Sequence, residues 1–291
     1  MSDTLREQYL GRFRNVLAYI DANLHQDLSL EALSARAAFS KYHFHRQFAA
    51  LFGIGVYRYV RLCRLKSASY QLAFYAHKSV IDIALASGYE GPEAFARAFK
   101  KTFGQTPSDF RKQPQWNPWY ATHLQLKHSR MHCMKSSQRH DSVSIVHVND
   151  IKVAVLEHHG DPSLIGEAIR KFIQWRKENH LPRHSSATFN IFYNGPEDKD
   201  HRLDLCAAIE QDVAPNELGI VTKIIPAGRC AMLRHVGSDD MLGASFNYLY
   251  SQWLPQSGEE LRDFPLYMQR VKFFPDVAEN AAVSDIYLPL R

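Results

Sequence analysis

An internal duplication in the first third of the chain constrains its fold more than any other feature. Residues 41–53 and 92–104 align at an offset of 51, and five aligned positions are identical. The identical pairs are Phe44/Phe95, Arg46/Arg97, Phe48/Phe99, Phe52/Phe103 and Gly53/Gly104. Because the phenylalanines recur at helical spacing, each copy is predicted to be an amphipathic helix that buries its aromatic face and ends at glycine.

A shorter helix is expected before each copy. At an offset of 50, residues 29–39 match residues 79–89 in pattern: a serine able to cap a helix, an apolar stretch, and a small residue at a tight turn. A short helix, a turn and a second helix make the helix-turn-helix pattern. Residues 29–53 and 79–104 are therefore predicted to form two such units in an all-α N-terminal domain.

The outward faces of the two second helices carry the residues expected to read DNA bases. They are Lys41, Tyr42, His45 and Arg46 in the first unit, and Glu93, Ala96, Arg97 and Lys100 in the second. Arginine is well shaped to bind guanine through two hydrogen bonds, and it recurs at the same helical position in both units. In the second unit Pro92 cannot donate a hydrogen bond and Glu93 would repel phosphate, so the first unit is expected to dominate sequence recognition.

The segment between the units reads as one helix over residues 55–75. A helix of about 20 residues spans roughly 30 Å, which is close to the roughly 34 Å between successive major grooves on one face of DNA. A single chain is thus long enough to address two adjacent groove segments of double-stranded DNA. The predicted phosphate contacts are Arg58, Arg61, Arg64, Lys66 and Lys101.

The charge distribution supports a polyanionic partner for the first half alone. Residues 1–139 carry 20 lysines and arginines against 9 aspartates and glutamates, whereas residues 140–291 carry 15 against 21. Residues 13–112 also resemble the DNA-binding domain of AraC/XylS transcription regulators. The resemblance is strongest in SKYHFHRQFAALFG at 40–53 and in the closing TPSDFR. The resemblance implies seven helices, with Tyr42, His45 and Arg46 as base readers. It makes RNA polymerase an expected partner.

The second half of the chain contains its own duplication. Residues 152–176 align with 229–253 at an offset of 77, and each copy reads as a strand, a glycine turn and a helix. Two further strands follow each copy, at 187–193 and 203–209 and at 266–273 and 283–290. Residues 143–291 are therefore expected to form an α+β domain of tandem β-α-β-β repeats. Residues 113–142 are expected to be a linker with a short helix around 119–126.

This second half resembles the GyrI-like effector-binding domains in its HxG turns, in FYNGP at 192–196 and in SDIYLPL at 284–290. The resemblance implies a site for a hydrophobic small-molecule effector between the two repeats, with aromatic walls and a buried glutamate. The expected lining residues are Trp175, Tyr193, Trp253, Tyr267 and Gln269. Gln269 stands where the glutamate is expected, which favours a neutral ligand or none. His158 and His235, which recur after the first strand of each repeat, are expected to stabilise turns.

Two alternatives remain for this half: a protein-interaction module for gyrase or RNA polymerase, and a GyrI-like hydrolase. The sequence contains no GxSxG motif, zinc triad or phosphate loop, so no catalytic residue, metal or cofactor is expected. Its N-terminus is polar, and no stretch approaches the ~20 apolar residues of a membrane helix. The cysteines are scattered without a CxxC pair, which favours reduced thiols in the cytoplasm.

Overall fold

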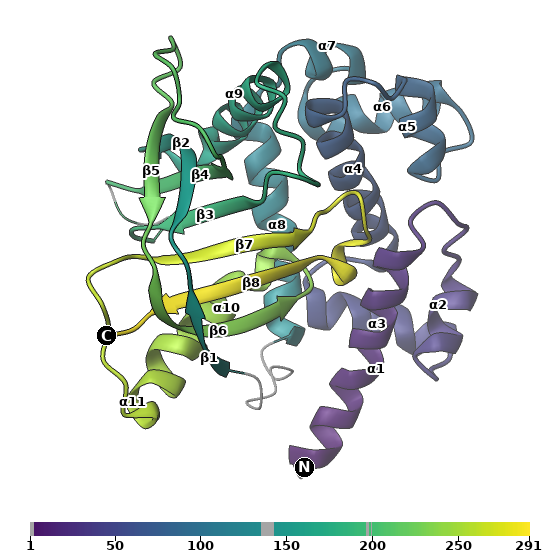
Figure 1. Ribbon diagram of the computed structural model, residues 1–291. Coiled ribbons are helices and arrows are strands. Elements are labelled where there is room, and N and C mark those ends of the chain that lie inside the picture. The colour runs from purple at the N-terminus through teal and green to yellow at the C-terminus, as the bar shows by residue number, and fades with distance from the viewer. Residues whose placement is uncertain (1–2, 135–142, 196–197, 199) are drawn as a thin grey trace. The chain divides into compact units, whose positions relative to one another are not determined.

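The computed structural model describes every residue except 1–2, 135–142, 196–197 and 199, and the described chain folds as two compact domains (Figure 1). We call them the helical domain and the sheet domain. The helical domain comprises residues 1–138 together with two short later segments, 238–241 and 274–280. The sheet domain comprises residues 139–237, 242–273 and 281–291.

The helical domain contains the seven helices that the AraC-type resemblance implies, followed by an eighth. Their bounds are α1 (Asp3–Ala22), α2 (Leu30–Arg36), α3 (Lys41–Phe52), α4 (Val56–Phe74), α5 (Val80–Ala86), α6 (Pro92–Phe103), α7 (Pro107–Lys112) and α8 (Trp116–Met134). The predicted helix-turn-helix units are α2–α3 and α5–α6, and α4 is the predicted connecting helix. In each unit the turn residue has a positive φ, +54° at Ala38 and +72° at Gly88.

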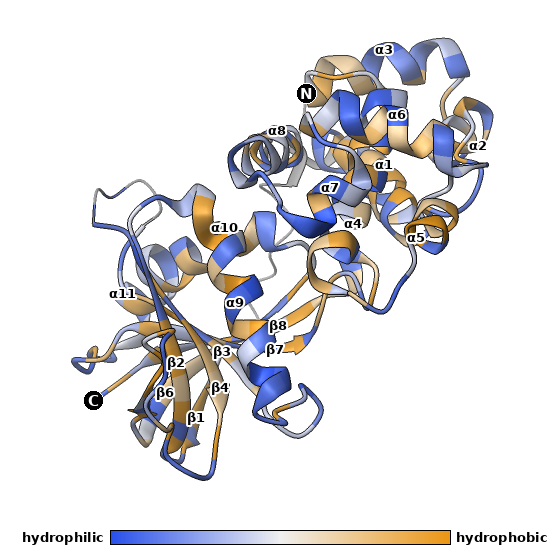
Figure 2. Cartoon of the chain, turned by 90° about the horizontal axis from the view of Figure 1, so that it is seen from above, coloured by the Kyte–Doolittle hydropathy of each residue, from blue (hydrophilic) through white to orange (hydrophobic). Residues whose placement is uncertain are grey.

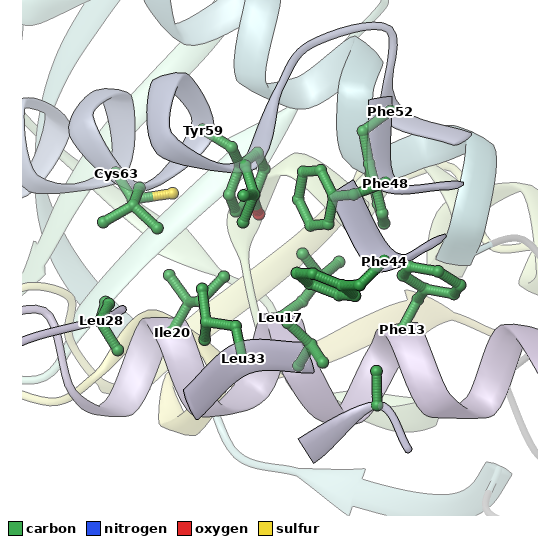
Figure 3. Packing of buried hydrophobic residues seen from close by; sticks show 14 of the residues in the cluster. Phe13, Leu17, Ile20, Leu28, Leu33, Phe44, Phe48, Phe52, Tyr59 and Cys63 are labelled. Atoms are coloured by element: carbon green, nitrogen blue, oxygen red, sulfur yellow. The ribbon is translucent and has the colours of Figure 1, made fainter. Parts of the chain in front are cut away.

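The phenylalanine stripe of the first unit is buried as predicted. Phe44, Phe48 and Phe52 are 0–3% exposed, and all three pack against Phe13 of α1, with ring centroids 5.9–6.4 Å from the Phe13 ring. Figure 3 shows these rings meeting Leu17 and other α1 residues in one cluster. Each buried phenylalanine contributes about 1.5–3 kcal/mol relative to its exposed state, so this stripe is structural.

The second unit has a separate core that explains why the expected linker is helical. Phe95, Phe99 and Phe103 are at most 1% exposed and share a cluster with Trp116 and Trp119. The two tryptophans lie in the first turn of α8, where they close this core. The structure thus corrects the linker prediction: residues 116–134 form a 19-residue helix, because their aromatic residues are buried by tertiary contacts that the local sequence does not reveal.

The sheet domain contains the predicted duplication. Its elements are β1 (Val143–Val148), β2 (Ile151–His159), α9 (Ile165–Glu178), β3 (Thr188–Phe192), β4 (Arg202–Ala208), β5 (Val221–Ile225), β6 (Gly228–Val236), α10 (Leu242–Tyr248), α11 (Leu254–Ser257), β7 (Leu266–Lys272) and β8 (Val283–Pro289). The first repeat is β2-α9-β3-β4 and the second is β6-α10-β7-β8. A π-helical turn over Leu249–Trp253 joins α10 to α11, so the second predicted helical stretch is continuous.

The eight strands of the described residues form one antiparallel sheet in the order β1-β6-β8-β7-β3-β4-β2-β5. The repeats meet where β3 pairs with β7. The strand that precedes each repeat pairs with the other repeat: β1, before the first repeat, pairs with β6, and β5, before the second, pairs with β2. The strand β5 was not predicted, because five residues that include a lysine give only a weak strand pattern.

The helices α9 and α10 lie on the same side of this sheet (Figure 2). The other side, which we call the helix-free face, is lined by alternate residues of each strand, since neighbouring residues of a strand point to opposite faces. Much of it is buried, because side chains from both repeats pack together in one cluster that includes Val153, Phe189 and Cys230.

Among the described residues, no helix combines the length and hydropathy needed to cross a bilayer. Three of the four cysteines, Cys63, Cys206 and Cys230, are buried free thiols. Cys133 lies outside the residues whose side chains are described.

Candidate nucleic-acid interface and effector surface

Serine caps fix the ends of the first helix-turn-helix unit. The Ser29 hydroxyl accepts a hydrogen bond from the Ala32 backbone N–H at 3.2 Å, and Ser40 accepts one from His43 at 3.4 Å. The helix α3 then stops at Gly53, whose φ of +70° is a left-handed cap. The predicted cap at Ser29 is confirmed, and α3 has a defined start from which its outer face is presented.

The second unit has the same architecture with one local difference. The Ser79 hydroxyl accepts a hydrogen bond from Asp82 N–H at 3.0 Å, and α6 ends at Gly104 with a φ of +76°. At the start of α6, however, Gly91 is the N-cap and provides no side-chain hydrogen bond. Pro92 occupies the first helical turn, where its missing N–H is not needed by the helix.

The outer face of α3 is open to solvent. Lys41, Tyr42, His45 and Arg46 are all exposed, and Tyr42 retains 74% of its accessible surface. Lys41 Nζ lies 3.7 Å from Glu31 and 5.4 Å from the centre of the Tyr42 ring. Arg46 has no hydrogen-bond or ion-pair partner among the described residues, so its guanidinium is available to a ligand.

The outer face of α6 is also exposed, but it is of mixed charge. Glu93, Arg97 and Lys100 are exposed and Ala96 is half-buried, while Lys101 adds a further exposed cation. Arg97 matches Arg46 and likewise has no partner within the described chain. The structure therefore presents both predicted arginines, and it also presents Glu93, whose carboxylate would oppose a phosphate backbone.

The predicted phosphate contacts on α4 divide into two groups. Arg58 and Arg61 are exposed, with only a 3.5 Å hydrogen bond from Arg58 to Gln125. Arg64 is half-buried instead, and its guanidinium donates to the backbone carbonyls of Leu24 at 2.9 Å and Gln26 at 2.6 Å. Arg58 and Arg61 remain candidates for phosphate, whereas Arg64 is already engaged within the domain.

Lys66 requires a correction, because its side chain points into the helical domain and is only 4% exposed. It belongs to a group of five charged residues that we call the buried ionic cluster: Asp21, Lys66, Arg130, Asp240 and Glu279. The Lys66 ammonium lies 3.0 Å from Asp240 and 2.6 Å from Glu279. A buried ammonium held by two carboxylates is not a phosphate contact, and helical periodicity alone did not distinguish this position from Arg61.

Arg130 of α8 is the second cation of the buried ionic cluster. Its guanidinium donates to Asp21 at 2.8 Å and to the Tyr59 hydroxyl at 2.8 Å, and it lies 2.9 Å from Glu279. Asp240 and Glu279 belong to the helical domain although they lie far along the sequence. The cluster thus contains three carboxylates and two cations.

The excess carboxylate is reflected in the pKa values of the cluster. Burial raises the pKa of Asp21 from 3.8 to about 7, against the opposing charge of Arg130. Burial acts on Glu279 in the same direction, but Arg130 and Lys66 outweigh it and hold the Glu279 pKa well below its ordinary value. Asp21 is therefore the carboxyl of the cluster that is most easily protonated, whereas Glu279 stays ionised near neutral pH.

The predicted effector residues of the sheet domain lie on two different faces. Trp175 packs with Phe172 under α9, and Trp253 packs against the core beneath α10, so both lie on the helix side of the sheet. Strand register and alternation place Tyr193, Tyr267 and Gln269 on the helix-free face. The latter three residues therefore share one face of the sheet, where Tyr267 is fully buried, and the two tryptophans lie on the other face.

The helix-free face also carries a charge network that sequence reasoning missed. Glu157 and Asp204 lie directly opposite each other on β2 and β4, and Asp204 is fully buried. Asp204 accepts hydrogen bonds from Tyr193 at 3.0 Å and from Lys223 at 3.0 Å. Arg202 bridges the two carboxylates at 3.2–3.3 Å. Two like charges side by side in a sheet are unfavourable unless such cations compensate them.

These partners change the acidity of the network. Hydrogen bonds from His159 and Lys223 lower the pKa of Glu157 to about 2, so its carboxylate is ionised at neutral pH. In the second repeat Asp285 lies opposite Arg234, which donates to it at 2.7 and 2.8 Å. The carboxylates of Glu157, Asp204 and Asp285 are therefore each paired with protein cations. No sequence signal could have identified these pairs, because strand register is a tertiary property.

The recurring histidines have hydrogen-bond partners just beyond their strands. His158 Nε2 lies 3.2 Å from the Asp161 carbonyl, and His235 Nδ1 lies 2.9 Å from the Ser245 hydroxyl. Both side chains are under 9% exposed. These contacts join each strand to the segment that follows it, in agreement with the expected role in turns.

Comparison with known proteins matches each half of the chain to a described domain. Residues 141–291 match the GyrI-like small molecule binding domain, and residues 33–113 match a helix-turn-helix domain. The chain is 32% identical to the probable transcriptional regulator YgiV of Escherichia coli K12 over 152 residues, which cover 51% of this chain and 95% of YgiV.

Two further relatives are similar to a shorter part of the chain. The right origin-binding protein of Escherichia coli K12 is 36% identical over 107 residues, which cover 37% of each chain. The Tn10 TetD protein of Escherichia coli is 33% identical over 111 residues, which cover 38% of this chain and 80% of TetD.

Proposed function

The chain belongs to the GyrI-like family and joins this domain to an AraC-type helix-turn-helix domain, and from this premise we propose that it is a sequence-specific DNA-binding transcription regulator. The observation that carries the proposal is the pair of matched arginines. Arg46 and Arg97 occupy equivalent positions on α3 and α6, and both are exposed without a partner in the described chain. The 19-residue helix α4 connects the two units and is roughly 28 Å long, close to one turn of DNA.

The two units contribute unequally to recognition in this proposal. The helix α3 offers Tyr42, His45 and Arg46 together on one open face, and their phenol, imidazole and guanidinium groups are suited to base edges. The helix α6 offers Arg97 beside Glu93, which can only accept hydrogen bonds. We therefore assign most sequence discrimination to the first unit, and mainly position and affinity to the second.

A selection of duplexes from random DNA by the full-length protein tests the proposal. A single enriched motif with two half-sites is the expected result, and a failure to enrich any sequence would contradict it. Arg46→Ala should then weaken binding to the selected duplex by roughly 5- to 150-fold, since a bidentate arginine contributes about 1–3 kcal/mol of discrimination. Arg97→Ala is the matched control and should cost less. An equal loss by Arg46→Ala on scrambled DNA would show that Arg46 contacts only phosphate.

For the sheet domain we propose that the helix-free face receives a small, neutral, aromatic effector. The support is its composition: Tyr193 is exposed, Gln269 is half-buried, and the buried Tyr267 ring stacks on Tyr287 with ring centroids 5.0 Å apart. Since Glu157, Asp204 and Asp285 are already paired with protein cations, a cationic ligand would have to displace a lysine or arginine. Trp175 and Trp253 support the sheet from its other side and are not assigned to this surface.

Thermal unfolding of the full chain with two probes of similar shape tests the effector proposal. Triphenylmethanol is neutral, and tetraphenylphosphonium is a lipophilic cation. We expect triphenylmethanol to raise the melting temperature more, and Tyr193→Ala to reduce the rise. If neither probe shifts the transition, the result would favour the alternative in which this domain binds a protein. We assign no catalytic role, and we propose that the regulator acts in the cytoplasm with RNA polymerase as its eventual partner.

A further inference from the structure

Arg64, which the sequence analysis assigned to phosphate, occupies a different place in the helical domain. It lies near the middle of α4, and its Nε and Nη2 donate to the carbonyls of Leu24 and Gln26 at 2.9 and 2.6 Å. Both carbonyls belong to the segment between α1 and α2, which leads directly into the Ser29 cap of the first helix-turn-helix unit. The guanidinium thus holds the entrance of the first unit against the connecting helix.

The same guanidinium lies against the turn of the second unit. A Cβ placed on Gly88 would lie 2.7 Å from both Cζ and Nη2 of Arg64, and 2.6 Å from the Leu24 carbonyl oxygen. Real Cβ atoms essentially never lie this close to a neighbour, so a side chain at position 88 would require Arg64 or the Leu24 backbone to move. Tyr89, the next residue, lines a cavity of about 360 Å³ together with Arg64 and Ser29. The segment that leads into the first unit and the turn of the second unit therefore meet at one side chain of α4.

The duplication offers an internal comparison that shows what is special about Gly88. The matched turn residue of the first unit is Ala38, which adopts a φ of +54° although it carries a Cβ. The left-handed turn conformation therefore does not by itself exclude alanine. What distinguishes Gly88, besides its φ of +72°, is the close approach of Arg64 and of the Leu24 carbonyl. The turn of the second unit thus accommodates the Arg64 side chain, whereas Ala38, the matched residue of the first unit, carries a Cβ.

We propose that Arg64 is a positioning residue that fixes the spacing and relative rotation of the two recognition helices, and thereby the half-site spacing that the regulator accepts. The inference rests on the proposed function as a two-unit DNA reader. Its physical basis is that a rigid, planar donor can bind two carbonyls at once and still present a face to the Gly88 turn. Binding contacts form well only when the residues that make them are held to within about 0.5 Å of the required positions. A side chain that fixes the two units relative to each other therefore determines the half-site spacing at which both recognition helices can contact DNA together.

The test measures binding as a function of half-site spacing. The probes are the duplex selected by the wild-type protein from random DNA, versions with one, two or five extra base pairs between the half-sites, and a duplex with the first half-site alone. For the wild-type protein we expect a sharp optimum, with a loss of about tenfold on a single insertion, equivalent to about 1.4 kcal/mol. For Arg64→Gln we expect weaker binding at the native spacing and a flatter profile, with affinity for the single half-site unchanged.

Three further variants complete the experiment. Arg64→Lys keeps the charge but cannot reproduce the two fixed bonds, so it should flatten the profile in part, and it remains informative if Arg64→Gln folds poorly. Gly88→Ala should flatten the profile because it separates the turn from Arg64, whereas Ala38→Gly is the matched control and should leave the profile unchanged.

Two results would overturn the inference. One is a profile for Arg64→Gln that runs parallel to that of the wild type at every spacing, with an equal loss on the single half-site. The other is a wild-type profile for Arg64→Lys, since charge alone would then suffice. Both differ from failure of the proposed function, which would appear earlier as the absence of any selected sequence.

Discussion

Replacing Arg130 by methionine isolates the contribution of the buried ionic cluster. Methionine preserves much of the length and apolar character of the side chain but removes the charge and every donor. In the wild-type protein the Arg130 guanidinium is 1% exposed and contacts Asp21, Glu279 and Tyr59 at 2.8–2.9 Å. After the substitution Lys66 alone faces three carboxylates, and the Tyr59 hydroxyl loses its donor.

The expected cost follows from this geometry. Removal of one partner from a buried ion pair costs roughly 3–5 kcal/mol, because the remaining charge is left uncompensated away from water. Uptake of a proton by one carboxylate relieves part of the cost, and this relief is easier at low pH. We therefore expect Arg130→Met to lower the free energy of unfolding by about 3–5 kcal/mol at pH 8, and by less at pH 5.

Urea unfolding of the full-length chain, followed by tryptophan fluorescence, measures this loss, because Trp116 and Trp119 lie in the helical domain. Arg97→Met is the matched control: Arg97 is exposed without a partner in the described chain, so its loss should stay within about 0.5 kcal/mol. A loss below about 1 kcal/mol for Arg130→Met, or an identical loss at both pH values, would refute the view that the cluster depends on Arg130 for charge compensation.

Three other predictions concern single charges. In the wild-type protein the free energy of unfolding should fall as pH rises from 5 to 7, by up to about 1.4 kcal/mol per pH unit, because folded Asp21 keeps a proton that the unfolded chain has released. Asp21→Asn should remove this pH dependence in urea titrations. An unchanged pH dependence in that variant would exclude Asp21 as its source. In a plot of the logarithm of the DNA-binding constant against the logarithm of salt concentration, Arg61→Ala should reduce the steepness of the slope by about 0.9, whereas Lys66→Met should leave the slope unchanged. Similar slopes for both variants would contradict the exposed position of Arg61 and the buried position of Lys66. Glu93→Gln should strengthen DNA binding by roughly threefold at low salt by removing a repulsive charge, an effect that fluorescence anisotropy would detect and that should vanish at high salt.

Repetition made most of the architecture predictable from sequence. Two copies of a pattern must satisfy the same packing rules, so the paired phenylalanines identified α3 and α6, and the capping serines identified where α2 and α5 begin. In the second half the offset of 77 identified the β-α-β-β repeats in the same way. Elements outside either duplication were the ones misjudged: α8 was expected as a linker and β5 was not expected at all.

The candidate site was predictable only where exposure follows helical periodicity. Arg46 and Arg97 are exposed because the opposite face of each helix is buried phenylalanine, which the sequence displays directly. On α4 the same reasoning failed for Lys66 and Arg64, since both faces of that helix meet other parts of the domain. Trp175 and Tyr193 likewise looked equivalent as aromatic residues, but the packing of α9 places Trp175 on one side of the sheet and strand alternation places Tyr193 on the other.

The sequence by itself thus determined the two duplicated modules, their order and the basic character of the first, because local periodicity and caps specify helices and strands. Tertiary structure alone decided which cations face solvent and which are buried. Lys66 and Arg130 are held by Asp240 and Glu279, which lie more than a hundred residues away in sequence, and no local pattern encodes a partner at that distance. The physical reason is that burial of a charge depends on its compensation in space, and that compensation is a property of the fold.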